Sequence, residues 1–252
     1  MSLFMSLNRK ILSVIVLLGL SFNSNAIVNT ESTIQSLKQP GLNSKVSFEY
    51  KGSSGNNQSS KLALDASLAW VGQGHKSVLV FGRDFGKSNS QINLDNSFIY
   101  AKHLQQVLDN SYVSIFAQNE KDEFRDIKSR VLIGLGFRSK INQNHIVEIS
   151  VMNEEIDSTS VLEMDRSSVR LNLMWFMSYE LDDNIAFKNT VYYQPNVDSF
   201  SDKQAINQAG LDFSINENLN IEFYHKLTHF SLPIGDSTST DTVYGSKISY
   251  KF

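Results

Sequence analysis

The sequence contains no cysteine and only three prolines among its 252 residues. Without cysteine, the chain has no disulfide framework, no thiolate zinc ligand, no catalytic thiol and no site for a lipoprotein anchor. Pro- or Ser-rich stretches that would separate domains are also missing, so we expect a single folded domain. After residue 26 no apolar run is long enough to predict a transmembrane helix.

An excess of positive charge is also lacking. Lysine and arginine number 23 against 26 aspartates and glutamates, for a net charge of -3. Two of the basic residues, Arg9 and Lys10, lie in the N-terminal segment that we expect to be removed, which leaves the remaining chain more acidic. Nucleic acid is therefore not an expected partner.

The first 26 residues have the order of a secretory signal peptide. The basic pair Arg9-Lys10 precedes the apolar run 11–20, and small and polar residues then lead to Ala26. We expect residues 1–26 to be cleaved on export. Residues 27–43 are interpreted as a short polar periplasmic lead-in, and residues 44–252 as one folded domain.

Alternation of apolar and polar residues dominates the chain after Asn43 and predicts β-strands. In the clearest segment one parity carries Val169, Leu171, Leu173, Trp175, Met177 and Tyr179, although Met174 and Phe176 on the other parity blur its end. Twelve such segments can be found. The facing of two of them, near 78–82 and 98–103, stays open because both parities are apolar.

The links between these segments alternate in length. Long polar links are expected near 52–60, 82–95, 118–125, 153–166, 194–205 and 229–241, with short ones near 71–76, 104–110, 139–144, 180–184 and 216–218. Outer-membrane barrels show this pattern, with short periplasmic turns and longer outer loops. The sequence therefore predicts an all-β, transmembrane, antiparallel up-and-down barrel of about 12 strands. A soluble periplasmic β-barrel that binds an apolar ligand would also alternate, but with the two parities inverted.

The chain ends in a segment typical of a last barrel strand. Gly245, Ile248, Tyr250 and Phe252 form a candidate signal for barrel assembly, because such signals end in an aromatic residue, and Lys247 and Lys251 lie on the other parity.

Three stretches resemble the DUF481 family, the group that contains the so-called salt-induced outer-membrane proteins. The first is the Gly- and Asn-containing hairpin 50–60, and the second is the acidic loop from Asp122 to Arg130 leading into Gly134-Leu-Gly-Phe137. The third is Pro233-Ile-Gly235 followed by Asp241-Thr242 and the closing Tyr250-Lys-Phe252. The resemblance implies an outer-membrane barrel and supplies no catalytic residues.

If the apolar parity faces lipid, the other parity faces the lumen. The basic candidates there include Lys128, Arg130, Arg138, Arg170, Lys188, Lys226 and Lys247, and the acidic candidates are Glu49, Asp65, Glu148, Asp212 and Glu222. An open, mildly basic lumen would favour anions. Alternatively, the charges pair across neighbouring strands and plug a narrow barrel. Further carboxylates, among them Asp122, Glu154, Asp202 and Asp241, are assigned to the outer loops.

The expected function is a non-enzymatic envelope protein, either a small pore or a structural or stress-related barrel. A lipid-modifying hydrolase is the enzymatic alternative, with His225 as general base and Ser246 as nucleophile on neighbouring strands. No cofactor or metal is expected. The expected partners are outer-membrane lipid, lipopolysaccharide and, during biogenesis, the barrel-assembly machinery and periplasmic chaperones.

Overall fold

The computed structural model describes residues 27–53, 59–88, 91–122, 127–158, 166–232 and 239–252. The predicted signal peptide lies outside this range, as do parts of the three family-like stretches and the loop carboxylates Glu123, Asp126 and Asp236.

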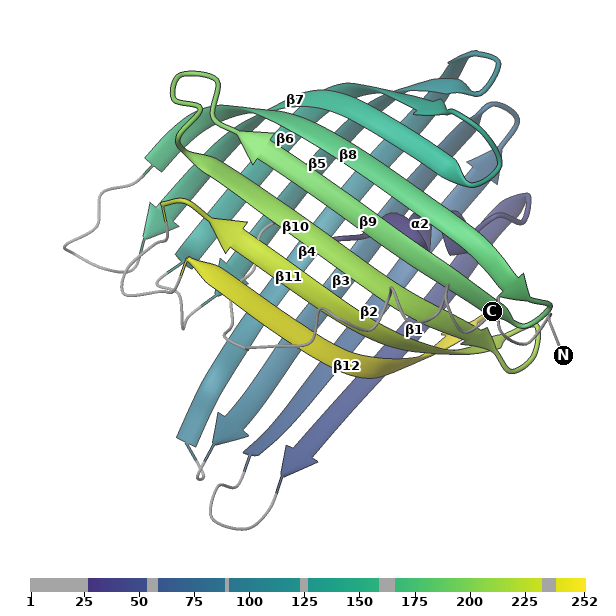
Figure 1. Cartoon of the computed structure of the whole chain (residues 1–252), viewed down its shortest axis with the longest axis horizontal. Helices are drawn as coiled ribbons and strands as arrows, with labels where there is room; N and C mark the ends of the chain where they lie inside the picture. Colours follow the sequence, from purple (N-terminus) through teal and green to yellow (C-terminus); the bar gives the residue numbers. More distant parts are fainter. Residues whose placement is uncertain (1–26, 54–58, 89–90, 123–126, 159–165, 233–238) are drawn as a thin grey trace, which may run out of the picture.

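Twelve antiparallel strands close into one barrel, as the alternation predicted (Figure 1). Each strand pairs with its neighbours in sequence, and the last pairs with the first. Their bounds are β1 Gly41–Ser53, β2 Ser59–Gly72, β3 His75–Ser88, β4 Gln91–Leu108, β5 Ser111–Asp122, β6 Ile127–Lys140, β7 His145–Ser158, β8 Arg166–Asp182, β9 Ile185–Pro195, β10 Lys203–Ser214, β11 Leu219–Phe230 and β12 Thr240–Lys251.

The links divide between the two ends of the barrel. One end carries the short links 73–74, 109–110, 141–144, 183–184 and 215–218 together with the start of β1 and the end of β12, and we call it the turn end. The other, the loop end, carries 54–58, 89–90, 123–126, 159–165, 196–202 and 231–239. One predicted long link is wrong, because most of 82–95 belongs to β3 and β4, which join through 89–90.

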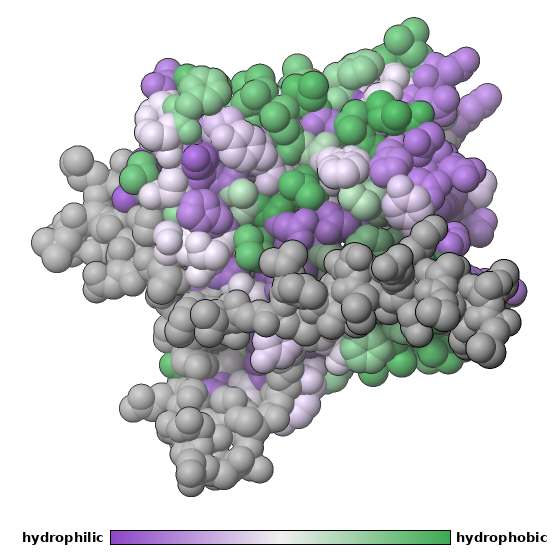
Figure 2. Space-filling model, viewed as in Figure 1, coloured by the Kyte–Doolittle hydropathy of each residue, from purple (hydrophilic) through white to green (hydrophobic). Residues whose placement is uncertain are grey.

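The wall is apolar outside and mostly polar inside. Along β5 and β7 exposed and buried positions alternate, and Ile115, Ile149 and Val151 are among the exposed side chains. Buried inward positions include Ser114, Gln118 and Asn172. Figure 2 shows hydrophobic patches over the wall and hydrophilic residues gathered toward its right-hand edge. This polarity is the reverse of a soluble barrel with an apolar interior, and it suits a barrel surrounded by lipid.

The N-terminal segment lies inside the barrel. Residues 27–40 run through the lumen and include the short helix α2, Glu31–Ser36, before Gly41 turns the chain into β1 with a positive φ of 92°. Ile27, Ile34 and Leu37 are buried there. The interpretation of 27–43 as a lead-in that precedes the barrel therefore does not match the structure, because these apolar side chains pack against the inner wall. No helix in the described ranges is long and apolar enough to cross a membrane.

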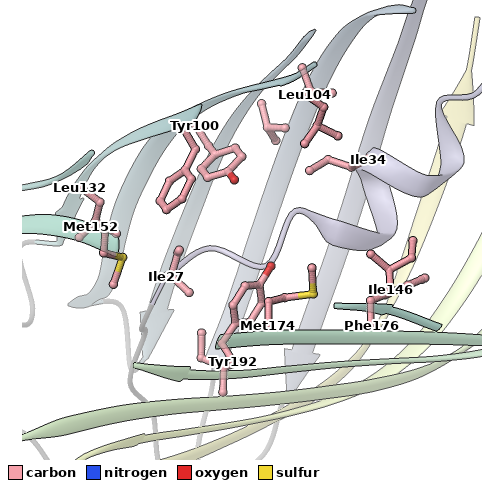
Figure 3. Packing of buried hydrophobic residues seen from close by; sticks show 14 of the residues in the cluster. Ile27, Ile34, Tyr100, Leu104, Leu132, Ile146, Met152, Met174, Phe176 and Tyr192 are labelled. Carbon is pink, nitrogen blue, oxygen red and sulfur yellow. The ribbon is translucent and has the colours of Figure 1, made fainter. Parts of the chain in front are cut away.

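The inner wall offers an apolar socket to this segment, which we call the plug, residues 27–40. Inward-facing side chains from every strand between β2 and β11 form one buried cluster with the plug (Figure 3). They include Val78, Val80, Tyr100, Leu104, Phe116, Leu132, Met152, Met174, Phe176 and Tyr192. The segments with apolar residues on both parities are thereby explained. Their outward residues form the outer face of the wall, and their inward residues face the plug.

Candidate functional site: the plugged lumen

A buried ion pair fastens the plug to the wall. Both carboxylate oxygens of Glu31 accept hydrogen bonds from the Arg138 guanidinium on β6, one of them at 3.0 Å. Arg138 also donates to Glu148 on β7 at 3.1 Å, and Lys102 on β4 donates to the same Glu148 oxygen at 2.6 Å. Ser114 completes the cluster by donating to the other Glu148 oxygen at 2.9 Å. The cluster therefore joins the plug to four neighbouring strands, β4 to β7, on one side of the wall.

Arg138 determines the charge state of Glu31. Burial works to raise the pKa of this carboxyl group, but the charge of Arg138 and its hydrogen bonds outweigh burial and lower the pKa to about 2. Glu31 is thus ionised at any pH near neutrality. An ionised carboxylate that is 1% exposed is stable there only because its partner is in place.

Further polar contacts hold the plug along its length. The backbone N–H of Val28 donates to Gln118 at 3.2 Å. At the end of α2 the Lys76 ammonium on β3 donates to the carbonyl oxygens of Ile34 and Leu37, where the helix leaves such acceptors unsatisfied. Asn43 then donates to the carbonyl oxygen of Gln39 at 2.7 Å. The plug is bound at several separate points as well as by its apolar side chains.

A second buried charge cluster lies nearer the loop end. Glu154 on β7 accepts from Arg130 at 2.8 Å and from Arg170 at 2.5 Å, and Gln204 donates to both of its oxygens. Arg170 also pairs with Asp202 at 2.9 Å. Arg130 and Glu154 are each 1% exposed, so these side chains fill the lumen between β6, β8 and β10.

The basic residues predicted to face the lumen do not all lie in the same surroundings. Arg130, Arg138 and Arg170 are buried inside the barrel. Lys188 pairs with Asp212, and Lys247 pairs with Asp65 at 2.6 Å. Lys226 lines the lumen chamber described below. Lys128 does not join the set. A bulge between Ile127 and Ser129 turns Lys128 outward at the rim, where its mostly exposed ammonium pairs with Asp157 at 2.8 Å.

Several carboxylates assigned to outer loops are instead inside the barrel. Asp122, Glu154 and Asp241 are each 1% exposed and belong to strands, because β5, β7 and β12 extend further than their polar composition suggested. Glu120 on β5 is buried as well and lies 3.5 Å from Arg130. These buried carboxylates offset the predicted excess of basic side chains in the lumen. Of the two alternatives, the structure shows the one in which lumen charges form pairs.

The plug lies between two hollows. A chamber of about 140 Å³ is lined by plug residues 28–30 and Thr33 and by polar side chains of the wall, among them Glu49, Lys61, Asp65, Asp84, Tyr224, Lys226 and Lys247. A wider vestibule of about 1230 Å³ is lined by plug residues 34–39 and by strand ends at the turn end.

The C-terminal candidates lie at the turn end. Ile248, Tyr250 and Phe252 point outward and are exposed, and the rings of Tyr250 and Phe252 meet edge to face with centroids 4.8 Å apart. Gly245 is on the other parity, opposite Tyr224 of β11.

His225 and Ser246, the candidate hydrolase residues, are diagonal neighbours on the outward parity of β11 and β12. His225 lies opposite Tyr244, and Ser246 lies opposite Phe223. The described residues hold no group of three or more His, Asp or Glu side chains placed to bind a metal ion.

Three residues of the candidate site were not predicted from the sequence: Glu31, Lys102 and Glu120. Glu31 belongs to a segment interpreted as a lead-in, although Ile27, Thr30, Ile34 and Leu37 recur at helical spacing there. Glu120 continues the inward parity of Ser114, Phe116 and Gln118, and this continuation is the signal that could have found it.

These features define a class of protein. A closed twelve-stranded antiparallel barrel with an apolar outer face, a polar lumen, and short links at the end where β1 starts and β12 ends is a β-barrel of the outer-membrane type. Solved structures agree on the fold. The translocator domain of the autotransporter NalP from Neisseria meningitidis is similar with a TM-score of 0.52 at 11% identity, over 88% of this chain and 93% of that one. The COG4313 outer membrane channel from Pseudomonas putida F1 gives 0.51 at 8% identity, over 84% and 95%.

Within this class the chain belongs to DUF481, described as a protein family of unknown function, whose family model matches residues 46–252. The resemblance noted from the three sequence stretches is confirmed. A search of curated proteins finds no match. The family match begins within β1, so the plug precedes the matched region.

Proposed function

We propose that this protein is a non-enzymatic barrel of the bacterial outer membrane that acts as a small channel closed by its own N-terminal segment. The turn end faces the periplasm and the loop end faces outward, as in barrels whose two chain ends are periplasmic. Bilayer lipid and lipopolysaccharide surround it, and the terminal strand with Ile248, Tyr250 and Phe252 engages the assembly machinery and periplasmic chaperones during biogenesis.

One observation carries the proposal: the charged side chain of Glu31, on a segment that forms no part of the wall, is buried in the lumen against Arg138. A segment held by ionic contacts can leave when those contacts weaken. Covalent connection to β1 through Gly41 keeps it tethered to the turn end. The barrel therefore conducts little while the plug is seated.

The charge pairs of the wall determine the ion selectivity of an opened lumen. Arg130, Arg170, Lys188 and Lys247 each have a carboxylate partner, so the expected ion selectivity is weak. A lumen with unpaired basic groups would instead prefer anions.

Planar-bilayer recordings test the proposal with two charge-removing variants. Glu31→Gln should increase the frequency of channel openings, because the neutral amide pairs less strongly with Arg138. Lys188→Gln is the matched control, since it breaks a wall pair with Asp212 and leaves the plug contacts intact. Equal opening frequencies in wild type and Glu31→Gln would argue against an ionic latch.

A further inference from the structure

The length over which neighbouring strands pair differs around the barrel. Most neighbouring strands pair along nearly their whole length, as β1 and β2 do from Gly41↔Val71 to Ser53↔Ser59. The pairing of β1 with β12 covers only four residues on each strand, from Lys45↔Lys251 to Phe48↔Ile248. Beyond Phe48 no further pair joins the two strands among the residues that the structure describes. Figure 1 shows the yellow β12 diverging from β1–β4 toward the loop end.

The line where β1 meets β12, which we call the seam, lies within the apolar belt of the wall. Phe48 and Ile248, the last paired positions, have exposed side chains on the outer face, and so does Tyr50 just beyond them on β1. Lipid tails cannot hydrogen-bond the backbone groups of a strand edge, so an edge at this depth requires a polar neighbour. Polar side chains of the lumen, or a molecule that enters the seam, can supply such a group.

The inner side of the seam is highly polar. The 140 Å³ chamber is bordered by Ser47 and Glu49 on one edge and by Lys247 on the other. Side-chain contacts cross the seam inside the barrel. The hydroxyl oxygens of Ser47 on β1 and Ser249 on β12 lie 2.8 Å apart in a hydrogen bond. Tyr224 of β11 donates to Glu49 at 2.6 Å, and Lys247 of β12 pairs with Asp65 of β2 at 2.6 Å.

The charge pairs of the chamber are more accessible than those elsewhere in the lumen. In the Lys247–Asp65 and Lys61–Asp84 pairs each side chain is about a quarter exposed, whereas the Arg130–Glu154 pair is 1% exposed on both sides. Both signs of charge are therefore open to a visiting group. A headgroup with one phosphate and one ammonium complements such a mixture better than a simple anion does.

We propose that the seam between β1 and β12 is a lateral portal through which a zwitterionic phospholipid of the surrounding bilayer places its headgroup in the chamber. Its acyl chains stay outside against Phe48, Tyr50 and Tyr244. The phosphate is bound by the lysines and the ammonium by the carboxylates. This activity is independent of conduction past the plug.

Headgroup labelling of single cysteines tests the portal, and the natural absence of cysteine removes background. The full processed protein is reconstituted in vesicles of phosphatidylethanolamine and phosphatidylglycerol that contain a small fraction of a phosphatidylcholine analogue. The quaternary ammonium of this analogue carries a maleimide on an alkyl linker, so the headgroup keeps both of its charges. Ser47→Cys and Ala63→Cys place a thiol on the chamber wall. Thr190→Cys is the matched control, because Thr190 is equally inward on β9 and does not line the chamber.

We expect both chamber variants to be labelled by the lipid and the Thr190→Cys variant not to be. The heat-modifiable gel shift confirms folding of each variant, and Phe252→Cys at the exposed turn end verifies that the reagent is active. The portal is refuted if neither chamber cysteine is labelled by the lipid, whether or not a water-soluble maleimide reaches them. Equal labelling of Thr190→Cys refutes it too, because the headgroup would then enter by another route. None of these results alters the conductance test of the plug.

Discussion

Arg138 on β6 binds both carboxylate oxygens of Glu31, a residue 107 positions earlier that belongs to no strand of the barrel. The same guanidinium binds Glu148 of the wall. Arg138 therefore connects the plug with the barrel, and the state of the lumen depends on this connection.

The plug should be released by acid. The pKa of Glu31 is lowered from 4.5 to about 2 when the plug is seated. A lowered pKa means that the stabilisation is complete above pH 4.5 and is lost as pH falls toward 2. Channel openings should accordingly increase across this window in bilayer recordings. Glu31→Gln should show little change over the same window, and an identical pH response in both proteins would contradict this assignment.

Glu154 should be required for the stability of the loop-end half of the barrel. Replacing it with glutamine leaves the buried guanidinium groups of Arg130 and Arg170 without their shared anion, at a cost of about 3 kcal/mol in the free energy of unfolding. The neighbouring Glu155→Gln is the control, since Glu155 is exposed on the outer parity. Urea unfolding in lipid vesicles measures both, and equal midpoints would disprove the role given to Glu154.

Gly134 provides space for an aromatic ring of the plug socket. A Cβ at this position would lie 2.3 Å from Cζ of Phe116. Gly134→Ala should therefore lower the free energy of unfolding by about 1–3 kcal/mol through overpacking. The double variant Gly134→Ala/Phe116→Leu should recover part of the loss because the ring is gone. If the single variant unfolds like wild type, the ring must relocate without cost.

Cysteine pairs can report where the seam opens. Phe48→Cys/Ile248→Cys places two thiols on directly paired positions, so a disulfide should form readily on mild oxidation. Tyr50→Cys/Ser246→Cys would be the next pair on the same face if the ladder continued, and it should oxidise much less. Comparable disulfide yields from the two pairs in proteoliposomes would show that the seam is closed along its length.

Much of the barrel wall could be predicted from alternation alone. The stripe from Val169 to Tyr179 and the terminal strand both face outward as expected from their parity, apart from the strand end near Tyr179, where both parities become exposed. Strand ends at the loop end could not be predicted, because lumen-facing and loop residues are both polar. Glu154 continues the inward parity of Glu148, Ser150 and Met152, yet its composition resembles a loop.

The plug could not be predicted from the pattern, for a physical reason. Alternation describes a wall with two different surroundings, lipid and lumen, and it assumes that the lumen is polar. Met174 and Phe176 interrupt the alternation of β8 because the plug gives them an apolar neighbour inside the barrel. Such interruptions mark the socket, although only the fold shows which segment fills it.

Conductance of a plug deletion tests the central claim most directly. Removal of residues 28–39 keeps all twelve strands and takes away Glu31, α2 and their contacts. Wild-type protein should remain mostly closed in a planar bilayer at neutral pH, and the deletion variant, folded as judged by its heat-modifiable gel shift, should conduct steadily. A deletion variant as silent as wild type would show that the paired wall side chains close the lumen without the plug, and a wild type that conducts as well as the deletion would show that the plug closes nothing.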